Sequence, residues 1–299
     1  MDKVIKLIPI IKSYIWGGTY LKAFKNTKAE IISESWELSI RKDNICSVYG
    51  FSKTIDQLIS DEDLGENVKR FPYFPLLIKL IDAKENLSIQ VHPSDEYALK
   101  NEHSFGKSEM WHIISADKGS GLYVGLNRDY TKKEIEEKLR TNKIEECLNF
   151  FEVKPGDTFL INPGTIHAIG KGVRLIEIQQ NSDLTYRLYD YLRKDKNGNY
   201  RELHIDKALN VINYHKYNFQ PVKGDVLADN RYFKVVRKEV HGEMKIAADE
   251  GSFKTFTFIE GEGIVDDIPY RKFDTFFLAN NKSCLVKGDG VVIISSVNK

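Results

Sequence analysis

The sequence predicts a mainly β protein with a few short helices, on three observations. Short apolar or alternating runs recur between clusters of Gly, Pro, Asn and Asp, which is the pattern of β-strands separated by turns. The 15 Tyr and 16 Phe residues add side chains that favour strands. Two segments far apart in the chain also share one pattern. Together these features predict antiparallel sandwiches or barrels.

The expected strands share period-two alternation or a short apolar run bounded by turn residues. They lie at 87–91, 158–161, 173–178, 232–236, 255–259 and 291–294. The later runs follow one another closely without a helical pattern between them, which favours antiparallel pairing.

The longest expected helix covers 131–149, where apolar residues fall near helical spacing on a charged background. Thr131 and Glu134 have the spacing of a capping box. Shorter helices are expected over 54–60, 95–100 and 204–214. The helices are few and therefore decorate a β framework.

The repeated pattern joins GDTFLINP at 156–163 to FDTFFLAN at 273–280. Each copy is followed by a small loop and a Gly-rich entry to an apolar strand, so two copies of one β-barrel unit are predicted. Chance similarity of two hairpins is the alternative. We expect a first domain over 1–225 with short helical insertions. A second domain over 226–299 has no counterpart of His167 and hence no metal site.

Composition excludes several classes of protein. The 299 residues suffice for about two domains. With 44 Lys+Arg against 43 Asp+Glu, the net charge of +1 offers no basic excess for nucleic acid. No run of 18 apolar residues indicates a membrane span. Three distant cysteines form no disulfide framework. The N-terminus lacks a signal-peptide pattern, so a cytoplasmic location is expected.

A polar strand face marks the first candidate site. On an extended strand Ser88, Gln90 and His92 share one face, while the aliphatic residues between them share the other. Side chains at i and i+2 converge on one point, as a metal inside a barrel requires. Glu109 at the start of a later strand would add a carboxylate. The alternatives are an ordinary wet strand face and a solvent-exposed acid.

The segment from Gly156 to His167 resembles the second cupin motif, in which a strand, a Pro-Gly turn and a returning strand aim one His into the barrel. The Pro is displaced by one position, and Lys171 replaces the trailing Asn. Gln90-x-His92 matches the first cupin motif with Gln in place of the first His. The cupin resemblance implies jelly-roll barrels.

The motifs 90–93, 107–111 and 164–168 together resemble the type I mannose-6-phosphate isomerase family, in its short bacterial form. The similarity runs from about residue 5 to the end, and it is strong to residue 191 and weak beyond about 225. It implies one Zn²⁺ per chain, although such ligands also suit other divalent metals. The implied metal ligands are Gln90, His92, Glu109 and His167.

The same resemblance implies catalytic roles for Glu177, Asp183 and Arg187, which keep the family's spacing. It adds Lys107, two residues before Glu109, and Lys79 within an apolar strand. Near a metal cation the pKa of a lysine falls, which would suit proton transfer. The alternatives are a structural arginine and a snorkelling lysine.

The substrate-binding residues expected from this match are Ser88, Arg187 and Lys79, since a guanidinium suits a phosphate. The implied reaction interconverts mannose 6-phosphate and fructose 6-phosphate through a cis-enediol(ate). The general base stays open among Lys107, Lys79, Glu177 and Asp183, and the oligomeric state stays open. Alternatives are a cupin enzyme acting on another phosphosugar, a cupin oxygenase, a non-catalytic sugar-binding or regulatory cupin, and a purely structural double barrel.

Overall fold

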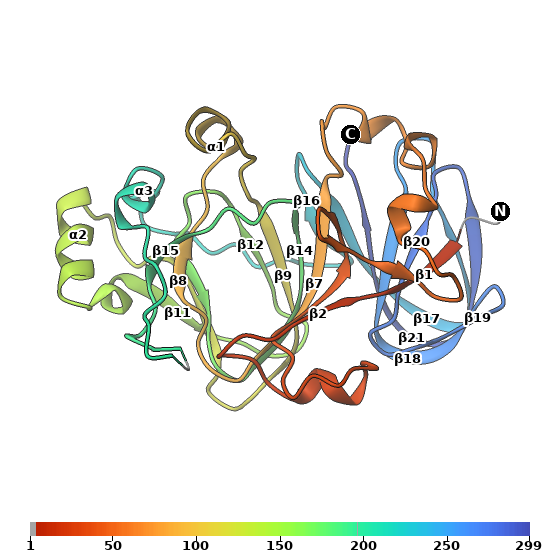
Figure 1. Cartoon of the computed structure of the whole chain (residues 1–299), viewed down its shortest axis with the longest axis horizontal. Coiled ribbons are helices and arrows are strands. Elements are labelled where there is room, and N and C mark those ends of the chain that lie inside the picture. The colour runs from red at the N-terminus through yellow and green to blue at the C-terminus, as the bar shows by residue number, and fades with distance from the viewer. Residues whose placement is uncertain (1–3, 196) are drawn as a thin grey trace.

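The computed structural model describes residues 4–195 and 197–299, and it confirms a mainly β fold with few helices. Three sheets carry the architecture (Figure 1). No helix in the described ranges is long and apolar enough to cross a bilayer. All three cysteines are free and buried.

Two sheets face each other in the half of the molecule that precedes residue 190. The six-stranded sheet has the order β12 (Thr158–Ile161), β9 (Glu109–Ala116), β14 (Val173–Gln180), β7 (Leu76–Ala83), β3 (Glu34–Leu38), β2 (Ile10–Lys12). The five-stranded sheet has the order β11 (Leu148–Glu152), β10 (Gly121–Leu126), β13 (His167–Ile169), β8 (Ile89–Val91), β15 (Tyr186–Tyr189). Apolar side chains from both sheets, such as Trp111 and Val124, fill part of the space between them.

The third sheet holds the C-terminal strands. Its order is β16 (Val226–Asp229), β17 (Lys234–Ala247), β21 (Ser283–Ser296), β18 (Lys254–Val265), β20 (Thr275–Leu278), β1 (Val4–Ile8), β6 (Ser47–Val48), with β19 (Ile268–Arg271) on β18. β4 (Ile40–Arg41) and β5 (Asn44–Ile45) form a separate pair. The N-terminal β1 and β6 complete this sheet, and the division at residue 225 stays a prediction.

The helices expected over 131–149, 204–214 and 54–60 are shorter in the structure, whereas the helix expected over 95–100 extends to Glu102. α2 (Lys132–Arg140) begins with the predicted capping box, but Asn142 adopts a left-handed conformation and Leu148 pairs with β10. Two further helices are α1 (Asp95–Glu102) and α3 (Ile205–Leu209). Single 3₁₀ turns are η1 (Tyr20–Ala23), η2 (Ile55–Gln57), η3 (Asp61–Asp63), η4 (Glu66–Val68) and η5 (Ile144–Cys147).

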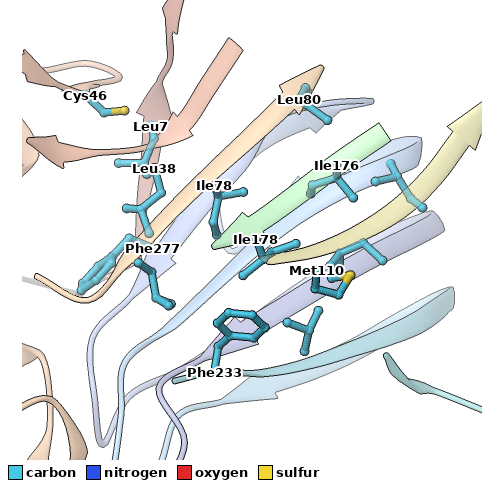
Figure 2. Close-up of a cluster of buried hydrophobic side chains, with 14 of the residues drawn as sticks. Leu7, Leu38, Cys46, Ile78, Leu80, Met110, Ile176, Ile178, Phe233 and Phe277 are labelled. Carbon is cyan, nitrogen blue, oxygen red and sulfur yellow. The ribbon is translucent and has the colours of Figure 1, made fainter. Parts of the chain in front are cut away.

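A large apolar layer joins the six-stranded sheet to the C-terminal sheet (Figure 2). It takes even-numbered residues such as Ile78, Met110 and Ile176 from one side, and Phe233 and Phe277 from the other. Because side chains alternate along a strand, the odd-numbered residues of β7, β9 and β14 face the opposite way, into the space between the first two sheets.

The two similar segments adopt the same turn. Gly156 and Phe273 have positive φ angles of 91° and 72°. The carboxylates of Asp157 and Asp274 each accept a hydrogen bond, both 2.9 Å long, from the backbone N–H three residues earlier. A non-glycine residue in this conformation is costly, so packing of the buried Phe273 side chain offsets the strain.

The strand order around the two turns is also the same. β12-β9-β14-β7 in one sheet corresponds to β20-β18-β21-β17 in the other, with antiparallel pairing throughout. One difference is that Gly172 lies in a turn before β14, whereas its counterpart in the repeat, Gly290, lies within the continuous strand β21. Closure of each copy into a jelly-roll barrel stays a prediction.

Candidate metal and active site

Three strands bring the four expected metal ligands together. Gln90 lies on β8, and His167, the first residue of β13, is its cross-strand partner. His92 directly follows β8, and Glu109 begins β9 in the facing sheet. The intervening residues of β8 pack in the other direction, against α2, so period-two alternation points the polar side chains inward.

The ligand atoms of His92, Glu109 and His167 all lie within 4.8 Å of one another, and the three residues are buried. The Gln90 amide nitrogen lies 3.3 Å from Nε2 of His167. A half-turn of this amide brings its oxygen to the same place, where it can serve as a ligand.

Backbone carbonyls fix which nitrogen of each imidazole carries the proton. Nδ1 of His92 lies 2.9 Å from the Leu184 carbonyl oxygen, and Nδ1 of His167 lies 2.9 Å from that of Thr165. A carbonyl only accepts, so each Nδ1–H donates and each Nε2 keeps a bare lone pair. Burial lowers the pKa of both rings, which favours the neutral form that binds metals.

Two acceptors therefore face each other in a buried space. Nε2 of His92 lies 3.2 Å from Oε1 of Glu109. Among the described residues, neither Nε2 of His92 nor Oε2 of Glu109 has a hydrogen-bond partner. Unpaired buried acceptors are costly, and a divalent cation between them would remove that cost. The residues present fit a metal ion with nitrogen and oxygen ligands.

The Lys107 side chain supports Glu109 from outside this group. Its Nζ lies 2.6 Å from Oε1 of Glu109. Burial raises the pKa of the Glu109 carboxyl, but Lys107, with His92 and His167, holds it well below its ordinary value. This favours the ionised form of Glu109, which the expected metal site requires.

A cleft of about 330 Å³ opens beside these residues, and Gln90 and Lys107 line it. On its wall Lys79 and Glu177 are cross-strand partners, with Nζ 3.0 Å from Oε1. Trp111, the partner of Glu177 on its other side, donates its indole N–H to Oε2 at 2.9 Å. Trp111 also contacts the His167 ring edge-on, so the ion pair is linked to the metal ligands.

Lys79 points into the polar cleft, where several carboxylates surround its ammonium group. Burial lowers its pKa, but the carboxylates of Glu177, Glu34 and Glu109 raise it above the ordinary value of a lysine. The carboxylates outweigh burial for the side chains described, and the fall expected beside a bound metal cation stays a prediction. Lys79 is buried and paired with Glu177, so it does not snorkel to solvent.

Arg187, Ser88 and Asp183 line the same cleft. Nε of Arg187 donates to the Ser88 hydroxyl at 3.3 Å. Asp183 lies at the rim, with a side chain that is 69% exposed and paired with Arg41 at 2.6 Å. All the site residues expected from the sequence thus lie at the metal ligands or around one cleft.

The cleft also contains residues that the site predictions omitted. They include Tyr14, Trp16, Glu34, Trp36 and Arg201. Glu34 accepts a hydrogen bond from the Trp36 indole at 2.6 Å and lies 3.9 Å from Nζ of Lys79. The spacing Glu-x-Trp on a strand signals a shared face, but Arg201 lies in a loop that gives no such signal.

Comparisons with known proteins agree over most of the chain. Residues 4–112 match the family described as phosphomannose isomerase type I, catalytic domain. The chain is 36% identical over 288 residues to "Mannose-6-phosphate isomerase ManA" of Bacillus subtilis, covering 90% of this chain and 91% of that protein. It is 34% identical to the mannose-6-phosphate isomerase of Streptococcus mutans, covering 95% of each.

The fold agrees with solved structures as well. The crystal structure of the mannose 6-phosphate isomerase from Bacillus subtilis superposes with a TM-score of 0.87 at 33% identity, covering 98% of this chain and 99% of that one. A structure from Archaeoglobus fulgidus, described as a putative mannosephosphate isomerase, gives 0.83 at 26% identity, covering 99% and 98%. The chain belongs to the type I phosphomannose isomerase family.

Proposed function

We propose that this chain interconverts mannose 6-phosphate and fructose 6-phosphate through a cis-enediol(ate), with one Zn²⁺ held by Gln90, His92, Glu109 and His167. The observation that carries the metal site is the pair of buried, unpartnered acceptors on His92 and Glu109. Membership of the family favours this isomerase over a cupin that only binds or senses a sugar.

The proposed ion adds positive charge beside the cleft. Only one of the four ligands, Glu109, is a carboxylate, so the ligand set leaves a net positive site. When bound, the ion supplies electrostatic stabilisation of negative charge that develops on the substrate oxygens at C1 and C2. Zinc suits this mixed oxygen and nitrogen set, and other divalent metals also accept it.

Among the four candidate bases, Glu177 is the best placed. It is buried on the cleft wall, and burial and the Glu109 charge raise its pKa despite nearby Lys79 and Lys107. A carboxylate with a raised pKa accepts and returns a proton more readily near neutral pH. Lys107 is engaged with the ligand Glu109, and Asp183 is exposed and paired at the rim.

Lys79 and Arg187 take different parts in this proposal. Charged Lys79 holds the Glu177 carboxylate and stabilises negative charge on the enediolate. Arg187, with its hydrogen bond to Ser88, binds the substrate phosphate, because a guanidinium offers several donors in the geometry that a phosphate needs. Glu177 moves the proton between C1 and C2.

A coupled assay for fructose 6-phosphate, started from mannose 6-phosphate, tests the proposal. We expect turnover in the metal-loaded protein, loss after treatment with EDTA, and recovery on addition of zinc. Metal content measured at each stage separates a tightly held ion from an absent one. A folded, metal-loaded protein without turnover would contradict the isomerase, and full turnover of a protein shown to be metal-free would contradict the metal's role.

A further inference from the structure

Positive charge exceeds negative charge on one side of the cleft. Arg193 and Arg201 both bind the carboxylate of Asp190, which is 5% exposed. Arg201 makes two bonds to it, from Nε to Oδ2 at 2.8 Å and from Nη2 to Oδ1 at 2.7 Å. Among the described residues, no carboxylate lies within ion-pair distance of Arg187. Two guanidinium groups thus share one buried carboxylate, and the third, that of Arg187, pairs with none in the described part of the chain.

Arg187 and Arg201 are neighbours on the cleft wall. Both line the cleft, and the backbone carbonyl of Glu202, the residue after Arg201, accepts a hydrogen bond from Nη1 of Arg187 at 2.8 Å. Burial lowers the pKa of Arg187, and the Arg201 charge lowers it further. Two like charges held together beside a cavity favour a dianion between them.

Lys79, the other cation expected to bind phosphate, is already neutralised. Its ammonium group lies 3.0 Å from one carboxylate and 3.9 Å from a second. Nη1 of Arg201, by contrast, has no hydrogen bond to any residue in the described ranges. The free donor capacity on the cleft wall therefore lies with the arginines.

We propose that Arg201 is a second phosphate-binding residue, which clamps the substrate phosphate together with Arg187 and Ser88. Asp190 is a positioning residue, because its two bonds fix the plane of the Arg201 guanidinium. The inference rests on the proposed phosphosugar substrate and replaces Lys79 with Arg201 in the phosphate site.

The position of this clamp suits a six-carbon chain with phosphate at its far end. Arg187 is the cross-strand partner of the metal ligand Gln90. Ser88 lies two residues before Gln90 on the same strand face, about 7 Å along the strand. Phosphate at Ser88 and Arg187 would leave the reacting end of an open-chain sugar near the metal ligands.

Replacing Arg201 by Met keeps most of the side-chain stem and removes its charge and donors. We expect the KM for mannose 6-phosphate and the inhibition constant of inorganic phosphate to rise roughly 10- to 100-fold, the range of a charge-assisted hydrogen bond. The preference for mannose 6-phosphate over unphosphorylated mannose, as a ratio of kcat/KM, should fall by the same factor. Metal content and melting temperature verify that the protein is intact.

Arg174→Met is the matched control. Arg174 is also partly buried, at 21% exposure against 28% for Arg201, and also binds carboxylates, but it lies outside the cleft. Its replacement should leave all three quantities unchanged. An Arg201→Met protein that matches the wild type in phosphate inhibition and sugar preference would overturn the clamp.

Arg201→Lys tests the positioning role of Asp190, because lysine keeps the charge but cannot make both bonds. We expect an intermediate KM with kcat near that of the wild type. A KM equal to the wild-type value would refute the positioning role.

Calorimetric titration of the metal-loaded protein with inorganic phosphate separates this inference from the proposed reaction. Phosphate binding that weakens in Arg201→Met supports the clamp even if the wild type isomerises no sugar. Equal binding by both proteins overturns the clamp even if the wild type is an active isomerase.

Discussion

Two sheets of this molecule share strand order, pairing and one turn, yet within the described residues expected site residues lie on one sheet and not on the other. Across β9, β14 and β7 the register aligns Trp111, Glu177 and Lys79. When the two sheets are aligned at the shared turn, the register of β18, β21 and β17 places Phe256 at the position of Trp111, Ile294 at that of Glu177 and Val236 at that of Lys79.

The difference shows which part of the molecule determines the fold and which the chemistry. Both sheets turn apolar residues toward the layer between them, as Ile176 and Ile293 do. The opposite face of each sheet is free to vary. In the C-terminal sheet this face is apolar around Phe256, whereas in the six-stranded sheet it carries the ion pair of Lys79 and Glu177. A buried ion pair is weak evidence for stability, so the polar row is explained better by function.

The largest expected contrast is between Glu109 and its counterpart Lys254 on β18. Glu109→Ala removes the single carboxylate from the proposed metal ligands, and we expect kcat/KM to fall on the order of 1,000-fold with loss of bound metal. Lys254→Ala should change neither quantity. The coupled assay and metal analysis on both proteins measure this, and metal retention with normal turnover in Glu109→Ala would remove Glu109 from the site.

The next prediction replaces the ion pair Lys79 and Glu177 of the six-stranded sheet with the apolar residues found at the corresponding positions of the C-terminal sheet. Lys79→Val alone leaves Glu177 buried without its partner, and we expect the free energy of unfolding to fall by about 3–5 kcal/mol. The double variant Lys79→Val/Glu177→Ile copies Val236 and Ile294, and it should be as stable as the wild type or up to about 4 kcal/mol more stable. Both variants should lack isomerase turnover.

Urea unfolding at pH 7, with the same metal loading for each protein, measures these stabilities. Val236→Ala in the other sheet is the control for a small change at the corresponding position, and it should keep full activity. A double variant that is less stable than Lys79→Val alone would contradict this expectation. It would mean that the two apolar side chains do not replace the ion pair in the packing of the sheet.

Local patterns predicted several structural features around the candidate site. The alternation around Gln90 and His92 gives the inward face of β8, and the capping box at Thr131 starts α2 as expected. Such features depend on residues a few positions apart. The cupin-like spacing from Gly156 to His167 likewise reflects one turn between two strands.

Features that depend on distant pairing were missed. Nothing local indicates that β1 would pair with β20, 270 positions away in the chain, or that Lys79 would meet Glu177 across a sheet. The raised pKa of Lys79 follows from that pairing. Arg201 acquires its place through two hydrogen bonds to Asp190, which no periodicity encodes.

The smallest contrast concerns one row of hydrogen bonds that both sheets share. Nδ1 of His112 lies 2.8 Å from the Thr158 hydroxyl, and in the other sheet the hydroxyls of Thr257 and Thr275 lie 2.9 Å apart. Burial, aided by Arg237, lowers the pKa of His112 to about 4. His112→Thr should keep the hydrogen bond and remove the titrating group.

The sign of the pH effect follows from proton binding by this histidine. Unfolded, it titrates near about 6.5; folded, it titrates near 4. Between these values the unfolded chain binds a proton that the native state excludes, so the wild type loses up to roughly 1.4 kcal/mol of stability per pH unit as the pH falls. Urea unfolding from pH 7 to 5 should show a shallower decline for His112→Thr, while the exposed His215→Thr protein declines like the wild type. Equal slopes in all three proteins would mean that His112 is protonated in the native state over this pH range. The hydrogen bonds of His112 and Thr257 would then match in position only.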